Sequence, residues 1–148
     1  MGVIQRILVV CVGNICRSPM AEAVLRNALR NQEGITVESA GLGAMVDWPP
    51  AEFAEELMAE RGLDIAGHRA RQLSPELLHE ADLVLVMELG HKKAIEAEDA
   101  TARGKVFRLG EWQNRDIQDP FQRPKADFEK ILRQIDSCVA EWVEKLDT

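Results

Sequence analysis

The sequence has 148 residues, 46% of them apolar and 29% charged, with a formal net charge of −7. This suits one folded domain over residues 1–148 rather than a disordered chain, and the acidic balance argues against nucleic acid or an anionic membrane as partner. Because no apolar run reaches the roughly 20 residues of a membrane helix and no signal peptide is recognisable, we expect a cytoplasmic protein without stable membrane insertion.

The first half of the chain alternates between strand and helix patterns. A β-rich apolar run at 7–10 predicts a strand, and apolar residues at helical spacing over 21–29 predict the helix after it. Residues 35–37 predict a second strand. The pair Pro49-Pro50 precedes a second helical pattern, which we expect to stop near Gly62.

The alternation continues in the second half. Ser74-Pro75 can cap a short helix, and residues 83–87 predict a strand apolar enough to be buried on both faces, as in a parallel sheet. A helical stretch at 91–97 and a strand at 105–109 follow. A long polar loop over 111–124 then leads into a last helix, whose apolar stripe runs from 128 to 146. The pattern predicts an open α/β fold, in which ligands bind at the carboxyl ends of the strands.

The segment Cys11–Pro19 joins the first strand to the first helix and has the composition of a phosphate-binding loop. Such a loop can direct the N–H groups of Val12 to Ser18 at one anion. We expect Gly13 and Asn14 to supply left-handed backbone conformations, and Ser18-Pro19 to cap and begin the helix.

Three side chains complete a predicted phosphoryl-transfer site. Arg17 follows Cys11 by six residues, so its planar guanidinium can reach the anion that the loop amides hold. Cys11 would attack the phosphorus as a thiolate, which we expect the converging amides, the Arg17 charge and the Ser18 hydroxyl to favour over the thiol. The departing oxygen needs a proton, and Asp119, stiffened by the proline after it, is a better candidate than Asp116.

These residues resemble the low-molecular-weight protein tyrosine phosphatases along essentially the whole chain. The phosphate-loop motif is highly specific, and Asp119-Pro120 lies where the family has its catalytic acid. Three further segments are most similar to the bacterial branch, whose members act opposite tyrosine autokinases in exopolysaccharide export: Glu38–Gly43, Gly67–Gln72 and Asp82–Glu88.

The resemblance implies a three-layer α/β/α fold with a four-stranded, twisted parallel sheet and the phosphate loop between the first strand and the first helix. It implies catalysis by Cys11, Arg17 and Asp119 through a cysteinyl-phosphate, without metal or other cofactor, and a phosphotyrosine protein, a bacterial tyrosine autokinase, as the partner. The implied substrate-binding residues are Val12, Gly13, Asn14, Ile15, Cys16, Ser18 and Phe121. It also implies that Asn14, Ser18, Ser39 and His68 share hydrogen bonds that support the loop. Family members often have tyrosine where Phe121 stands, and this chain has no tyrosine.

The sequence leaves the roles of some other residues open. Cys16 either packs behind the loop or forms a reversible disulfide with Cys11, and Cys138 is expected in the core. We expect His79 and His91 at the surface. Candidates for a rim around the substrate ring, with plain loop packing as the alternative, are Leu42, Met45 and Trp48.

The sequence disfavours four other functions. A Walker-type nucleotide site is rejected because no Gly-Lys-Ser or Gly-Lys-Thr occurs. Arsenate reduction needs resolving cysteines, and none lies between Arg17 and Ser137. Phosphoarginine phosphatases carry Thr where this chain has Ile15. A non-enzymatic phosphotyrosine-binding module would need neither Cys11 nor Asp119.

Overall fold

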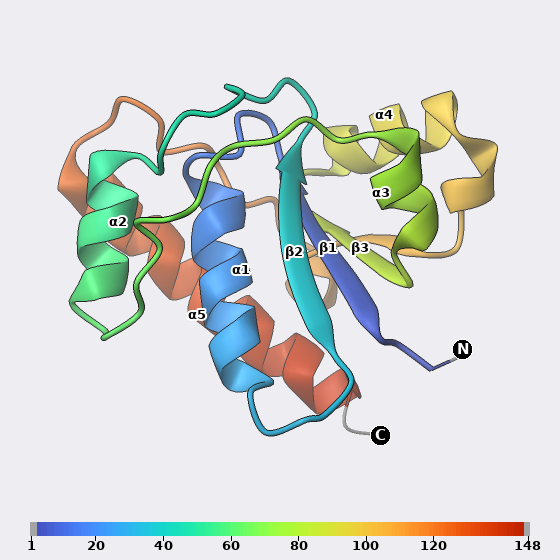
Figure 1. Ribbon diagram of the computed structural model, residues 1–148, viewed down its shortest axis with the longest axis horizontal. Helices are drawn as coiled ribbons and strands as arrows, with labels where there is room; N and C mark the ends of the chain where they lie inside the picture. The colour runs from blue at the N-terminus through green and yellow to red at the C-terminus, as the bar shows by residue number, and fades with distance from the viewer. Residues whose placement is uncertain (1–2, 147–148) are drawn as a thin grey trace.

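Four parallel strands form the centre of the fold, in the order β2-β1-β3-β4 (Figure 1). The computed structural model describes residues 3–146. The strands are β1 Arg6–Cys11, β2 Thr36–Gly41, β3 Leu83–Val86 and β4 Val106–Arg108. Every neighbouring pair is parallel, with β1 between β2 and β3. All four predicted strands are confirmed, and β2 extends four residues beyond its predicted end at Val37.

Five α-helices cover the two faces of the sheet, as the α/β pattern predicts. They are α1 Arg17–Ala28, α2 Glu52–Ala59, α3 Pro75–Glu80, α4 Leu89–Glu98 and α5 Lys125–Leu146. Figure 1 shows α1, α2 and α5 on one face and α3 and α4 on the other. Two short 3-10 turns, Ala100–Ala102 and Glu111–Gln113, flank β4. This is the expected three-layer α/β/α arrangement.

The side chains of β1 show why three layers form. Successive residues of a strand point to opposite faces. Ile7 and Val9 accordingly belong to the core under α1, α2 and α5, whereas Leu8 and Val10 belong to the core under α3 and α4. A strand that is apolar at every position therefore requires helices on both faces.

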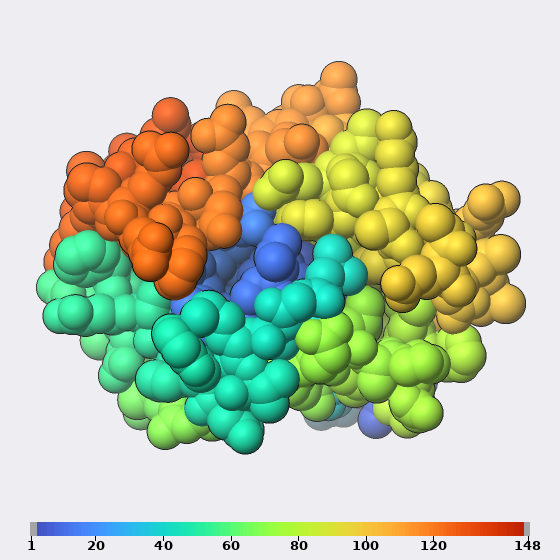
Figure 2. All heavy atoms as spheres, turned by 90° about the horizontal axis from the view of Figure 1, so that it is seen from above, coloured from blue at the N-terminus to red at the C-terminus, as the bar shows by residue number. Residues whose placement is uncertain are grey.

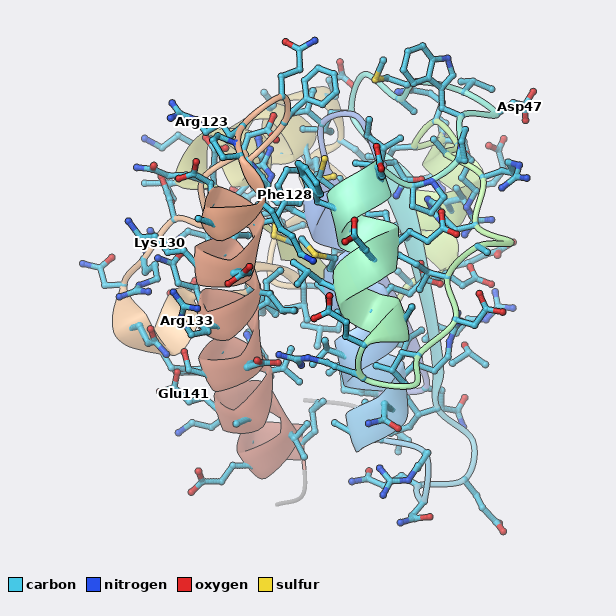
Figure 3. All side chains as sticks on the ribbon, turned by 90° about the vertical axis from the view of Figure 1, so that its left-hand side faces the viewer. Asp47, Arg123, Phe128, Lys130, Arg133 and Glu141 are labelled. Carbon is cyan, nitrogen blue, oxygen red and sulfur yellow. The ribbon has the colours of Figure 1, made fainter. Side chains whose placement is uncertain are left out.

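Helix α5 lies on the sheet along the apolar stripe seen in the sequence. Figure 3 shows Phe128 directed towards α2, with Lys130 and Arg133 on the opposite side of the helix. The Phe128 ring meets that of Phe53 edge to face, at 5.6 Å between centroids. Near the other end, the indole N–H of Trp142 donates to the Leu109 carbonyl at 2.8 Å. These contacts hold α5 against α2 and against the chain at the end of β4.

The capping residue predicted from the sequence is confirmed for α3 and wrong for α1. The Ser74 hydroxyl accepts a hydrogen bond from the Leu77 amide, and Pro75 is the first residue of α3. Helix α1, in contrast, begins at Arg17 with Cys16 at the N-cap and no side-chain cap. The prediction that Ser18 caps this helix is wrong, because its hydroxyl bonds to residues of the loop.

The prediction that His91 lies at the surface is also wrong. His91 is in the first turn of α4 and is only 9% exposed, whereas His79 is exposed as expected. Between residues 3 and 146, no helix has the length and apolar character needed to cross a membrane.

Candidate active site

A pocket of about 160 Å³ opens at the carboxyl end of β1, where the fold class places ligands. Figure 2 shows the loop after β1, in blue, at the bottom of a hollow between segments from the middle and the end of the chain. The lining residues are Cys11, Val12, Gly13, Asn14, Ile15, Cys16, Arg17, Gly43, Met45, Asp119 and Phe121. The structure thus brings the three predicted catalytic residues together in one pocket.

The backbone carbonyls of the phosphate loop (residues 11–18) are bound to the surrounding protein. The Cys11, Val12 and Gly13 carbonyls accept from the amides of Leu42, Gly43 and Met45, at 2.9 to 3.0 Å. Further along the loop, the Asn14 carbonyl accepts from His68 and the Ile15 carbonyl from Ala51.

The N–H groups of the loop face the other way. Within residues 3–146, none of the N–H groups from 12 to 16 donates to a protein acceptor. Because carbonyl and N–H groups point in opposite directions along the backbone, the bonds that hold the carbonyls outside direct the N–H groups into the pocket. Such a concave array of amides at a helix start binds anions.

Asn14 supplies the left-handed residue of this loop, with φ of 61°. Asn is one of the few residues that adopts this conformation readily. The expectation that Gly13 shares this role is wrong, since Gly13 does not have a positive φ.

A chain of hydrogen bonds leads from Asn14 to the Cys11 sulfur. The Asn14 side-chain amide donates to the Ser18 hydroxyl at 2.7 Å, and that hydroxyl lies 2.9 Å from Cys11 Sγ. Since the hydroxyl already accepts from the amide, its own proton is available to the sulfur. An anionic sulfur at this position would therefore have a hydrogen-bond donor directly beside it.

The orientation of Asn14 is fixed from several sides. Its side-chain carbonyl accepts from the Arg71 amide at 2.9 Å, and its NH₂ group also donates to Ser39 Oγ at 3.0 Å. Ser39 in turn donates to Glu22 at 2.6 Å. A carbonyl only accepts, so the 2.8 Å contact between His68 Nε2 and the Asn14 backbone carbonyl requires a proton on Nε2. Asn14, Ser18, Ser39 and His68 are thus connected; Glu22 and Arg71 join them without any signal in the sequence.

Arg17 is buried, and one side of its guanidinium is bound to protein. Nη1 donates to Glu88 at 2.5 Å and to the Ile117 carbonyl at 2.8 Å. Nη2 lies 3.9 Å from Asp119, and Nε has no hydrogen-bond partner between residues 3 and 146. The Nε and Nη2 edge is the edge available for two oxygens of an anion. Sequence reasoning missed Glu88.

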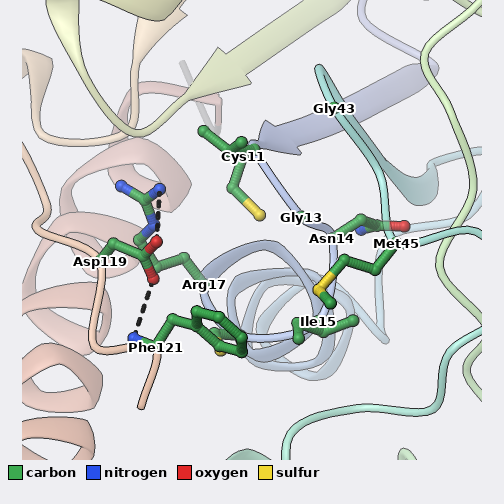
Figure 4. A pocket seen from close by; sticks show the side chains of 11 residues that line it. Cys11, Gly13, Asn14, Ile15, Arg17, Gly43, Met45, Asp119 and Phe121 are labelled. Atoms are coloured by element: carbon green, nitrogen blue, oxygen red, sulfur yellow. Dashed lines mark hydrogen bonds and ion pairs between the residues drawn. The ribbon is translucent and has the colours of Figure 1, made fainter. Parts of the chain in front are cut away.

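Asp119 lies at the mouth of the pocket, beside Arg17 and Phe121 (Figure 4). Its carboxylate accepts a hydrogen bond from the Phe121 amide at 3.0 Å, which orients it within the turn. Asp116 is engaged elsewhere, with the Leu89 amide and with Arg108. Desolvation by itself would raise the pKa of Asp116, but the hydrogen bonds from the Leu89 amide and Arg108 together outweigh it and hold this pKa below its ordinary value. Asp116 is therefore a structural carboxylate.

The three cysteines are free thiols, and all are buried. Burial, with the nearby charges of Asp119 and Cys11, raises the pKa of Cys16 to about 12. Cys16 is therefore a thiol under ordinary conditions and cannot serve as the anionic nucleophile. Cys138 lies in the core, as expected. A disulfide between Cys11 and Cys16 stays a prediction.

Part of the pocket wall is apolar. Met45 lines it together with Ile15 and Phe121, and Phe121 is 39% exposed. The other rim candidates do not belong to the lining: Leu42 borders a separate hollow between α3 and α4, and Trp48 is exposed. Ser18 also lies outside the lining, beneath the sulfur. Gly43, which the sequence did not indicate, lines the pocket.

No group of three or more His, Cys, Asp or Glu residues that could hold a metal ion occurs in the described part of the chain.

Comparison with known proteins gives consistent matches. Residues 6–148 match the family model described as low molecular weight phosphotyrosine protein phosphatase. The chain is 48% identical over 143 residues to a probable low molecular weight protein-tyrosine-phosphatase, EpsP, of Ralstonia solanacearum, covering 97% of each chain. It is 44% identical to the phosphatase Ptp of Acinetobacter johnsonii, covering 96% of this chain and 98% of that one.

Solved structures agree. The tyrosine phosphatase Wzb from Escherichia coli K30, in complex with sulphate, superposes with a TM-score of 0.90 at 36% identity, covering 97% of this chain and 99% of the other. The YwlE arginine phosphatase from Geobacillus stearothermophilus has a TM-score of 0.89 at 36% identity, covering 97% and 93%.

Gly41 offers a test of how the loop is held. A Cβ atom at Gly41 would lie 2.4 Å from the Val12 carbonyl oxygen, whereas one at Gly43 would meet nothing closer than 3.9 Å. Gly41→Ala must therefore displace the loop, and we expect it to weaken the binding of inorganic phosphate at least about tenfold. Isothermal titration calorimetry on this variant, with Gly43→Ala as the matched control, measures the effect. Equal affinities for both variants would contradict this account of the loop.

Proposed function

The chain belongs to the low molecular weight phosphotyrosine protein phosphatases, and from this premise we propose that it hydrolyses protein phosphotyrosine through a phosphocysteine at Cys11. The observation that carries the proposal is the joint placement of three groups around one small pocket. Cys11 Sγ lies at its base, the free edge of Arg17 at its side and Asp119 at its mouth. This is the order that in-line displacement at phosphorus requires.

In the first step the Cys11 thiolate attacks phosphorus, and the bond from phosphorus to the phenolic oxygen breaks. The loop amides and the Nε and Nη2 groups of Arg17 hold the three non-bridging oxygens as charge is redistributed among them. Asp119 gives its proton to the departing oxygen, so that the tyrosine leaves as a neutral phenol.

In the second step a water molecule attacks the phosphocysteine. Asp119, now a carboxylate, takes a proton from the water as the new oxygen–phosphorus bond forms. The sulfur–phosphorus bond breaks, and Cys11 returns to the thiolate as inorganic phosphate forms. Ser18 stabilises the thiolate as leaving group through the same hydrogen bond that favours it as nucleophile.

The walls of the pocket favour an aryl ester. Ile15, Met45 and Phe121 offer apolar and aromatic surface to a ring above the phosphoryl group. Phosphoarginine would bring a charged guanidinium against Ile15, which is buried and cannot hydrogen-bond to it. Arsenate reduction is disfavoured because it needs cysteines that carry a disulfide away from the loop. Cys16 lines the same pocket as Cys11, and Cys138, the one other cysteine of the sequence, lies in the core.

For the protein substrate we propose a bacterial tyrosine autokinase controlling capsule or exopolysaccharide production, encountered in the cytoplasm. The support is the resemblance of the sequence to the bacterial branch of the family, together with the similarity to the bacterial phosphatases EpsP and Wzb. The domain would act as a single unit over residues 1–148.

Replacing the nucleophile separates catalysis from binding. We expect the wild-type protein to hydrolyse a phosphotyrosine peptide faster than phosphoserine or phosphoarginine peptides, and Cys11→Ser to lower this rate at least about a thousandfold. Inorganic phosphate should still bind to Cys11→Ser, since the amides and Arg17 remain. Steady-state assays and calorimetry measure the two effects. Retained turnover would remove Cys11 from the mechanism.

The role of Asp119 is tested with leaving groups of different acidity. Asp119→Ala should slow hydrolysis of phosphotyrosine by about 10² to 10⁴-fold, because the phenolate of tyrosine leaves poorly without a proton. Hydrolysis of an ester of a strongly acidic phenol should slow far less. Asp116→Ala, which removes the neighbouring structural carboxylate, is the control. Equal slowing of both esters by Asp119→Ala would exclude Asp119 as the general acid.

A further inference from the structure

His91 is a buried histidine beside Glu88, which is one of the two groups that hold the Arg17 guanidinium. Its Nε2 lies 3.7 Å from the Glu88 oxygen Oε2, and the same oxygen accepts the 2.5 Å hydrogen bond from Arg17 Nη1. His91 Nδ1 is buried and has no hydrogen-bond partner between residues 3 and 146. Glu88 is the N-cap residue of α4 and His91 is the third residue of that helix, so the helix start fixes both.

We infer that His91 is a positioning residue for oxyanion binding: as a neutral imidazole it leaves the contact of Glu88 with Arg17 undisturbed, and as an imidazolium it competes with Arg17 for Glu88. The inference rests on the proposed function, since it concerns the same Arg17. His91 does not line the pocket and acts only through Glu88.

The competition follows from the geometry. Arg17 Nη1 and His91 Nε2 lie 2.5 Å and 3.7 Å from the same carboxylate oxygen of Glu88. A positive charge on His91 would attract this oxygen and repel the Arg17 guanidinium. Nη1 would then be held mainly by the Ile117 carbonyl. The contact of Nη1 with Glu88 orients the guanidinium. Without it, the Nε and Nη2 edge would be less well directed towards an anion.

The charges around His91 set the pH range of this effect. Burial lowers the pKa of His91 from its ordinary value of 6.5; Glu88 and the more distant Asp116 and Asp119 oppose this, and Arg17 adds to it. His91 is therefore neutral at pH 7 and takes a proton only below its ordinary range. It follows that anion affinity is complete near neutral pH and is reduced once the pH falls below the ordinary titration range of histidine.

Sulfate is the probe that isolates the effect, because it stays a dianion between pH 5 and pH 8. We expect wild type and His91→Gln to bind sulfate equally at pH 7, and wild type to bind it about fivefold more weakly than His91→Gln at pH 5. His79→Gln, at an exposed histidine, should follow wild type throughout. In a Glu88→Gln background the His91 substitution should have no effect. A constant affinity ratio from pH 5 to pH 8, or an undiminished effect without Glu88, would overturn the inference.

A measurement on the wild-type protein keeps the inference testable if a variant does not fold. By linkage, if a proton on His91 weakens sulfate binding, sulfate must lower the pKa of His91 to the same extent. An NMR titration of the His91 ring with and without saturating sulfate measures this. A pKa that is unchanged or raised by sulfate would reject the competition. Sulfate that fails to bind near Arg17 at any pH would instead contradict the proposed phosphatase site.

Discussion

The outward hydrogen bonds of the loop carbonyls are the constraint on which the site depends. Five consecutive carbonyls, from Cys11 to Ile15, accept from groups on the 42–51 segment or from His68. The carbonyl and the N–H of one peptide unit point in opposite directions. When the loop carbonyls accept hydrogen bonds from the surrounding protein, the loop N–H groups must therefore point into the pocket. The anion site is therefore a consequence of how the loop is held. This also explains Gly41, whose missing side chain lets β2 approach the Val12 carbonyl.

Polar side chains then position the groups that we propose to be reactive. Asn14 links the loop to β2 through Ser39 and directs the Ser18 hydroxyl towards the Cys11 sulfur. On the other side of the pocket, Glu88 and the Ile117 carbonyl take one end of the Arg17 guanidinium. The other edge is thereby committed to the pocket. The proposed catalytic groups lie on two segments, the phosphate loop and the loop before α5. Ser18, Ser39 and Glu88 hold the phosphate loop and Arg17 from outside the pocket lining.

Much of this could be predicted from the sequence, because local patterns carry it. The hydrophobicity of the strands predicted the parallel sheet. The spacing of Cys11 and Arg17, with an Asn14 that can adopt a left-handed conformation between them, predicted the phosphate loop. The misses share a cause, which is contact between distant segments. Glu22, Arg71 and Glu88 reach the site only in the folded chain. The helix pattern at 91–97 did not reveal which of its sides is buried, so His91 was misplaced. Ser18 is an exception: it has the sequence signature of a cap, but hydrogen bonds within the loop, to Asn14 and Cys11, determine its role.

The most direct test of the central claim is a crystal structure with orthovanadate, which adopts the five-coordinate geometry of phosphoryl transfer. The account predicts vanadium bonded to Cys11 Sγ, with its equatorial oxygens on the loop N–H groups and on Nε and Nη2 of Arg17, and Asp119 at the apical oxygen opposite the sulfur. Vanadate bound elsewhere, or bound here with the loop carbonyls turned towards it, would contradict the account.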